Sequence, residues 1–363
     1  MEQRLMTRKE ILKIENLKTY FDTWAGMVKA VDGVNISVRE GETLGLVGES
    51  GSGKSVTALS ILNIVPRPGK IIGGKIIYKG ENLLEKNESE IQKIRGKEIG
   101  YIFQDPSTSL NPVFSIADQL TEVIKRHQIV ETPSFQVKDL FRLKDTIRRR
   151  GDAKKEILQK AIELFKLVEI PDPEIKIWSY PHQLSGGMKQ RMAVARALSC
   201  QPKLLLADEP TTNLDVTIQA QILQLMKNLK QKLGMSMILI THDMGVVAGV
   251  ADRITVLYAG RVCETADTKT IFYKPRHPYT KALLTAVPSL ALKKEKLEVI
   301  PGTIPNLIEP PTGCRFHPRC EYAKPACAEK IPQLEEIEPG HYVACIRASE
   351  IDIESPLGAE MNE

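Results

Sequence analysis

Gly48-Glu-Ser-Gly-Ser-Gly-Lys54-Ser55 is the most informative stretch of the sequence, since it fits the pattern G-x-x-x-x-G-K-[ST] and follows an apolar run at 43–47. Its glycines let the backbone form a concave nest of N–H groups, and the helix expected from about Gly53 to Asn63 adds the positive end of its dipole. The stretch therefore predicts a phosphate-binding loop between a strand and a helix. The residues expected to line it are Gly48, Glu49, Ser50, Gly51, Ser52, Gly53, Lys54 and Ser55.

Within this loop, Lys54 is expected to place its ammonium between the β and γ phosphates of a nucleotide, and the Ser55 hydroxyl suits Mg²⁺. A second acidic element follows at Leu204-Leu-Leu-Ala-Asp208-Glu209, an apolar strand that ends in two carboxylates. Successive strand residues point to opposite faces, so the two acids should differ in role. We expect Asp208 in the Mg²⁺ shell and Glu209 as the base that deprotonates the attacking water.

Around these motifs the pattern of apolar runs changes along the chain. Residues 11–47 and about 71–103 read as strands, about 113–200 has helical periodicity, and from Lys203 strands and helices alternate, which is typical of a parallel α/β sheet. After Ala266 prolines recur. We therefore expect a first domain at 1–265 with a helical subdomain at about 105–190, an extension at 266–348 and a polar tail at 349–363.

Composition excludes several classes of protein. Apolar residues make up 42% of the 363 residues, enough for a sizeable core, and the net charge of +5 is too slight to indicate a nucleic-acid partner. No segment approaches the roughly 18 consecutive apolar residues of a membrane span, and the first ten residues lack the apolar core of a secretion signal. We expect any membrane role to be carried out through partners on the cytoplasmic side.

A second motif narrows the choice among families of proteins with a phosphate-binding loop. It is Leu184-Ser185-Gly186-Gly187-Met188-Lys189-Gln190, which resembles the LSGGQ signature of ABC ATPases with Met at the Gln position. The other elements of that family occur in order. Gln104 resembles the Q-loop glutamine that contacts Mg²⁺, Asn213-Leu214-Asp215 the D-loop, and His242 the switch histidine that contacts the γ-phosphate. Phe21, with Tyr20 as the alternative, resembles the aromatic residue on which adenine stacks.

The resemblance to ABC ATPases implies a RecA-like α/β core with an antiparallel β-subdomain, a helical subdomain and a small cysteine-rich extension. It implies that the chain hydrolyses ATP with Lys54, Glu209 and His242 as catalytic residues. It also implies a dimer of cassettes, in which Ser185 and Gly187 serve the nucleotide bound by the partner chain.

The phrases QDPSTSLNPVF and YPHQLSGGMKQR, and the run Arg276-His277-Pro278-Tyr279-Thr280, resemble the ATPases of oligopeptide and dipeptide permeases. This resemblance implies import of peptides, two transmembrane permeases, an extracellular solute-binding protein and a second, related ATPase as dimer partner. It places the chain peripherally on the cytoplasmic face of the cell membrane. Importers of nickel or glutathione share these phrases, and a soluble ABC protein acting on nucleic acid or ribosomes is the alternative from another class. Residues 129–150 look like an insertion without an assigned role.

Four of the six cysteines crowd into one proline-rich segment near the C-terminus, where Cys314, Cys320, Cys327 and Cys345 form C-x5-C-x6-C-x17-C. Four thiolates can enclose an iron–sulfur cluster or a tetrahedral zinc ion, and the spacing leaves free or disulfide-bonded cysteines open as well. Peptide permease ATPases carry a similar cysteine pattern, and that resemblance implies a [4Fe-4S] cluster that staples the extension. The other two, Cys200 and Cys263, are expected at the ends of elements as ordinary buried or half-buried residues.

Overall fold

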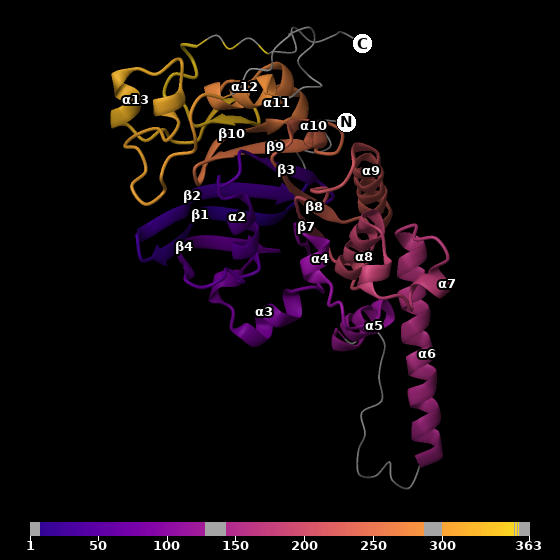
Figure 1. Ribbon diagram of the computed structural model, residues 1–363. Helices are drawn as coiled ribbons and strands as arrows, with labels where there is room; N and C mark the ends of the chain where they lie inside the picture. The colour runs from indigo at the N-terminus through magenta and orange to yellow at the C-terminus, as the bar shows by residue number, and fades with distance from the viewer. Residues whose placement is uncertain (1–7, 128–142, 287–299, 352, 354, 356–363) are drawn as a thin grey trace. The chain divides into compact units, whose positions relative to one another are not determined.

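The computed structural model describes residues 8–127, 143–286, 300–351, 353 and 355, with the side chains of 143–151 left out (Figure 1). The chain packs as two compact units. The first combines Met1–Asn87 with Ser236–Glu363, and the second is Glu88–Met235. Each unit carries a different part of the motifs found in the sequence.

An antiparallel sheet of long strands opens the first unit. Its order is β2-β1-β4-β5, formed by β1 (Glu10–Thr23), β2 (Gly26–Arg39), β4 (Gly69–Tyr78) and β5 (Glu81–Asn82), the last leading into the short η1 (Leu83–Glu85). Buried and more exposed residues alternate along β1 and β2, because one face of the sheet packs on the core and the other does not. This is the antiparallel β-subdomain that the sequence predicts.

Parallel strands form the centre of the first unit. β3 (Thr43–Val47) pairs in parallel with β8 (Ser236–Thr241) and β9 (Arg253–Tyr258). Every residue of β3 and β8 is buried, as expected for strands covered on both faces. Two helices follow strands of this sheet, α2 (Lys54–Ile61) after β3 and α10 (Met244–Ala248) after β8.

The C-terminal extension continues this sheet. β10 (Arg261–Asp267) pairs antiparallel with β9 and, through Glu264 and Thr265, with β12 (His341–Val343), which pairs with β11 (Glu335–Glu338). The boundary expected near 265 therefore falls inside β10. The remaining elements of the extension are α11 (Thr268–Tyr273), α12 (Pro278–Thr285), η4 (His317–Arg319) and α13 (Pro325–Glu329) (Figure 1).

The second unit is mostly helical. Among its described residues, the strands β6 (Ile99–Ile102) and β7 (Leu204–Asp208) pair in parallel. Its helices are α3 (Glu88–Ile94), α4 (Pro106–Ser109), α5 (Ile116–Arg126), α6 (Leu143–Leu167), α7 (Pro173–Lys176), η3 (Pro181–Gln183), α8 (Gly186–Leu198) and α9 (Val216–Leu233). The helical stretch expected at about 105–190 thus contains α4 to α7 and the start of α8. Of the insertion expected at 129–150, residues 129–142 lie outside the described residues. Residues 143–150 belong to the first part of α6.

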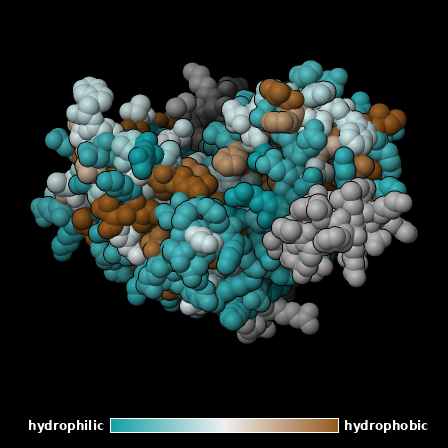
Figure 2. All heavy atoms as spheres, turned by 90° about the horizontal axis from the view of Figure 1, so that it is seen from below, coloured by the Kyte–Doolittle hydropathy of each residue, from teal (hydrophilic) through white to brown (hydrophobic). Residues whose placement is uncertain are grey.

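None of the described helices has both the length and the apolar composition needed to cross a membrane. Figure 2 shows that hydrophobic residues on the face drawn there gather in a few patches among hydrophilic residues. Cys263 is buried, as expected, but it is the third residue of β10 and does not lie at the end of an element.

Candidate nucleotide site

The phosphate-binding loop follows β3 directly, and its glycines occupy places where a side chain does not fit. A Cβ at Gly48 would lie 2.1 Å from the carbonyl oxygen of Leu257. Gly53 has φ +99°, and a Cβ there would lie 2.4 Å from the carbonyl oxygen of Ala30. The turn between β9 and β10 also contacts the loop, since the Gly260 N–H donates a hydrogen bond to the Ser52 carbonyl at 2.9 Å. Close packing against neighbouring backbone, and not only the flexibility of glycine, therefore fixes the conformation of the loop.

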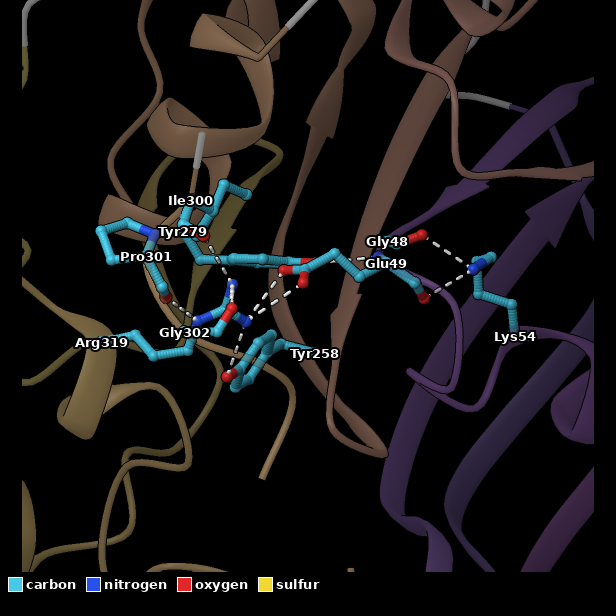
Figure 3. Close-up of polar contacts among 9 residues, drawn as sticks. All are labelled: Gly48, Glu49, Lys54, Tyr258, Tyr279, Ile300, Pro301, Gly302 and Arg319. Atoms are coloured by element: carbon cyan, nitrogen blue, oxygen red, sulfur yellow. Dashed lines mark hydrogen bonds and ion pairs between the residues drawn. The ribbon is translucent and has the colours of Figure 1, made fainter. Parts of the chain in front are cut away.

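Lys54 lies inside this loop. Its side chain is buried, with 4% of the residue exposed, and its Nζ donates to the carbonyl oxygens of Gly48 at 2.8 Å and Glu49 at 2.9 Å (Figure 3). Ser52 is also buried, whereas Ser50 and Gly51 at the tip are exposed and Ser55 is half-buried in the first turn of α2. The loop therefore presents one buried ammonium and a hydroxyl at the start of a helix.

The two aromatic candidates for the adenine, Tyr20 and Phe21 of β1, have different neighbours. The Tyr20 hydroxyl donates to Asp32 at 2.7 Å, and burial together with this hydrogen bond raises the pKa of Tyr20 to about 12. The Phe21 ring instead lies against Gly69, where a Cβ would come within 2.6 Å of the ring. Because Tyr20 is engaged in a polar cluster, Phe21 is the better candidate for stacking.

His242 also belongs to the first unit. It follows the last residue of β8 and is exposed, while its neighbour Asp243 caps α10 by accepting from the Gly245 N–H at 2.7 Å. The Asp243 N–H donates to Thr241 Oγ1 at 3.0 Å. His242 thus stands at a turn that is hydrogen-bonded on both sides.

The two carboxylates at the end of β7 have separate surroundings in the second unit. Asp208 is buried and accepts a hydrogen bond from the Tyr101 hydroxyl at 2.8 Å. Burial and the Asp208 charge raise the pKa of Tyr101, so its hydroxyl stays protonated and donates at neutral pH. The sequence reasoning missed Tyr101. No sequence pattern marks it, because the parallel pairing of β6 with β7 sets Tyr101 beside Leu206.

Glu209 has φ +43°, a left-handed conformation that is uncommon for a residue with a side chain and that recurs at functional sites. Its Oε2 accepts from Gln104 Nε2 at 2.9 Å and from Thr212 Oγ1 at 3.0 Å. The structure therefore brings Gln104 to Glu209, whereas the sequence assigned it to the Mg²⁺ shell with Asp208. Thr212 is a second residue that the motifs did not reveal.

The signature stretch begins a helix in the second unit. Ser185 is the N-cap of α8, and its hydroxyl accepts from the Met188 N–H at 3.3 Å. A Cβ at Gly187 would lie 3.0 Å from a methyl carbon of Ile218, so glycine permits close packing on α9. Asp215 of the D-loop caps α9 by accepting from Ile218 N–H at 2.9 Å.

The four clustered cysteines of the extension line one pocket, together with apolar side chains that include Phe316 and Ile351. The Cys314 N–H donates to the Cys327 carbonyl at 2.8 Å. Burial raises the pKa of Cys314 and Cys345, and raises that of Cys320 to about 11, so these thiols are protonated at neutral pH without a metal. Among the described residues, no three His, Cys, Asp or Glu side chains converge closely enough to hold a single metal ion.

A glycine-rich loop with a buried lysine, paired acids at a strand end and a capped signature helix define an ATP-binding cassette. Residues 31–212 match the family described as ABC transporter, and residues 263–327 match the one described as oligopeptide/dipeptide transporter, C-terminal region. The chain belongs to the ABC transporter family as an ATP-binding subunit, and it is an ATPase.

Named relatives align with most of the chain. The chain is 47% identical to the oligopeptide transport ATP-binding protein OppD of Bacillus subtilis, over 92% of this chain and 87% of that one. It is 44% identical to the dipeptide transport ATP-binding protein DppD of Escherichia coli, over 92% and 96%. A solved dimeric ATP-binding cassette bound to ADP and phosphate is 27% identical with a TM-score of 0.58, covering 71% of this chain and 98% of that chain. The RecA-like α/β fold predicted from the sequence is thereby confirmed.

Proposed function

We propose that the chain energises the import of dipeptides or oligopeptides. The observation that carries this proposal is the match of residues 263–327 to the C-terminal region of oligopeptide/dipeptide transporters. The two relatives named above are described as transporting oligopeptides and dipeptides, and they align over more than nine tenths of this chain. Nickel and glutathione importers remain the alternatives for the transported solute.

Within this function we assign the ATPase roles to residues of both units. Ser55, Asp208 and Gln104 would hold Mg²⁺, which neutralises charge on the β- and γ-phosphate oxygens. Lys54 binds the same phosphate groups, and Glu209 takes the proton of the attacking water. His242 contacts the γ-phosphate, Phe21 stacks on the adenine, and Ser185 with Gly187 serve the nucleotide of the other cassette in the dimer.

Membrane partners are part of the proposal. The chain would act peripherally on the cytoplasmic face with two transmembrane permeases, an extracellular solute-binding protein and a second ATPase subunit. An exposed apolar surface in the second unit supports docking. The Ile116 N–H donates to Ser179 at 2.9 Å, which brings two segments together, and their exposed large side chains are Val113, Phe114, Trp178 and Tyr180.

The experiment that tests import is reconstitution. The full chain, co-purified from native membranes with its partners, is placed in proteoliposomes with internal ATP and external solute-binding protein. We expect uptake of labelled di- or oligopeptides that unlabelled peptides suppress and that nickel or glutathione does not. Uptake of nickel or glutathione alone would overturn the peptide assignment, and recovery of ribosomal proteins in place of permeases would overturn the transport role.

We also propose a [4Fe-4S] cluster on Cys314, Cys320, Cys327 and Cys345, with zinc as the alternative. Support comes from the shared pocket of the four thiols. The four thiolates around a zinc ion converge on one atom, whereas each thiolate of a cubane cluster binds a different iron, so the bound metal distinguishes the two alternatives.

The test is metal analysis after anaerobic purification. We expect bound iron and sulfide, visible charge-transfer absorption, and loss of both in Cys320→Ser, while Cys200→Ser outside the pocket keeps them. Stoichiometric zinc without iron would replace the cluster by zinc, and absence of both metals would leave the cysteines as free thiols.

A further inference from the structure

Arg319 reaches the phosphate-binding loop from the C-terminal extension, 270 positions further along the chain (Figure 3). It is the last residue of η4, and its Nη1 lies 3.1 Å from both carboxylate oxygens of Glu49, the second residue of the loop. Only 6% of the Arg319 side chain is exposed, against 27% for Glu49. An ion pair this well covered is screened by water far less than one on an open surface.

The remaining donors of Arg319 are also occupied, which fixes the orientation of the guanidinium. Nε donates to the Pro301 carbonyl at 2.7 Å, and Nη2 lies 3.4 Å from the carbonyl oxygens of Ile300 and Gly302. Nη1 also donates to the Tyr258 hydroxyl at 3.2 Å, and the guanidinium stands 5.7 Å from the centre of that ring. Arg319 is therefore a rigid anchor rather than a mobile surface side chain.

Glu49 is held from three sides as a result. Its carboxylate accepts from Arg319, its N–H donates to the hydroxyl of the fully buried Tyr279 at 2.9 Å, and its carbonyl oxygen accepts from Lys54 Nζ at 2.9 Å. Two of these three partners, Arg319 and Tyr279, belong to the extension. Arg319 is thus connected to the phosphate-binding lysine through one intervening residue.

We propose that Arg319 is a positioning residue for ATP binding, which acts through Glu49 to preorganise the phosphate-binding loop. The loop must keep its N–H groups and Lys54 in one arrangement when ATP arrives, and restraint in the free protein lowers the entropy lost on binding. Without the pair, Glu49 keeps its backbone contacts but loses its charged anchor. The extension thereby contributes directly to the affinity of the cassette for MgATP.

The test is a double-mutant cycle on the full-length chain, read by MgATP titration calorimetry. Arg319→Gln replaces the guanidinium by a shorter, uncharged amide, and Glu49→Ala removes the partner without touching the carbonyl contacts of Arg319. We expect each variant to raise the Kd about tenfold, and the double variant to stay near about tenfold rather than reaching about a hundredfold. Arg319→Lys, which keeps the charge, should recover part of the affinity.

A purely structural role of Arg319 predicts different results. The matched control is Arg276→Ala, since Arg276 is a half-exposed extension residue 3.4 Å from Glu338 and bonds no loop residue among the described contacts. It should leave the Kd unchanged.

In the assembled transporter, Arg319→Gln should raise the KM for ATP and change kcat by less than about twofold. An unchanged Kd in folded Arg319→Gln, or additive effects in the double variant, would overturn the proposal. If Arg319→Gln does not fold, the Kd of Glu49→Ala for MgATP is the test, and a wild-type Kd in that variant would also overturn the proposal.

Discussion

At the scale of single residues, the proposed chemistry depends on neighbours that position each reactive side chain. Glu209 adopts φ +43° and is held by Gln104 and Thr212, while Asp208 is held by Tyr101. Such contacts fix the direction of each carboxylate before the substrate binds. No reorganisation energy is then needed in the transition state. The two adjacent acids are therefore not interchangeable.

Substituting Lys54 tests the phosphate role. Lys54→Ala removes a buried ammonium that donates to Gly48 and Glu49. Charge-assisted hydrogen bonds are worth about 1.5–3 kcal/mol, so we expect the affinity for MgATP to fall at least about tenfold. Calorimetric titration measures this, with Lys75→Ala, an exposed lysine of the same unit, as the control. Equal affinity in wild type and Lys54→Ala would contradict the assignment.

Substituting Glu209 separates binding from turnover. Glu209→Gln keeps the size of the side chain but removes the proton acceptor, so ATP should still bind while kcat falls about 10²–10⁴-fold. Phosphate release and nucleotide binding are measured together, and closed dimers should accumulate with ATP in size-exclusion chromatography. Glu163→Gln, an exposed acid of the same unit, is the control. Normal hydrolysis in Glu209→Gln would remove this residue as the base.

At the scale of elements, the junction of β3, the loop and α2 shows how packing selects glycine. Gly48 and Gly53 face backbone carbonyl oxygens of Leu257 and Ala30, whereas Gly51 at the tip has φ +80° and no heavy atom within 4 Å of a Cβ. Glycines of the same loop therefore meet different constraints. At Gly51 only the backbone conformation disfavours a side chain, whereas at Gly53 the conformation and a nearby carbonyl oxygen both do.

A pair of alanine variants distinguishes these constraints. Gly53→Ala places a Cβ 2.4 Å from a carbonyl oxygen at positive φ, so we expect a loss of about 2–4 kcal/mol in the free energy of unfolding. Gly51→Ala carries only the conformational cost and should lose about 1 kcal/mol. Urea unfolding measures both. Equal losses would show that the close approach to Ala30 does not constrain the loop.

At the scale of the whole molecule, the first unit is held together around one carboxylate. Asp32 of β2 accepts from Arg261 of β10 at 2.8 Å, from Arg315 of the extension at 2.6 Å and from Tyr20 of β1 at 2.7 Å. Arg315 also donates to the Ala259 carbonyl, and its side chain is 4% exposed. One residue thus joins the antiparallel sheet, the central sheet and the extension.

Asp32→Asn tests this connection through its pH dependence. Burial alone would raise the pKa of Asp32, but hydrogen bonds from Arg261 and Tyr20 and the charges of both arginines lower it below the ordinary value of 3.8. A lowered pKa in the folded state gives stability that is present above the unfolded pKa and is lost as the pH falls through the folded pKa. Asp32→Asn should therefore cost about 3 kcal/mol near pH 7, because two arginines lose their counter-charge.

The stability difference between wild type and Asp32→Asn should shrink as the pH is lowered below the ordinary value of 3.8, because the unfolded wild-type chain then binds a proton that the folded carboxylate does not. Chemical unfolding at each pH measures it. Asp22→Asn, at an exposed position of β1, should show no such dependence. A difference that is constant with pH would mean that the Asp32 charge does not hold the three parts together.

Local chemistry explains what was predictable from the sequence. The loop at 48–55, the acids at 208–209 and the signature at 184–190 are each contiguous, because a phosphate nest or a helix start needs adjacent backbone groups. The α/β class followed from the alternation of strands and helices. These elements, and the family they define, could be predicted without coordinates.

Tertiary structure alone decided the contacts that span the chain. Tyr101 meets Asp208 across 107 positions, Arg315 meets Asp32 across 283, and Arg319 meets Glu49 across 270. No periodicity or spacing marks such pairs, since each depends on the order and register of strands that are distant in sequence. The sequence therefore predicted which residues bind ATP, whereas folding placed Arg319 and Tyr279 of the C-terminal extension against Glu49 of that loop.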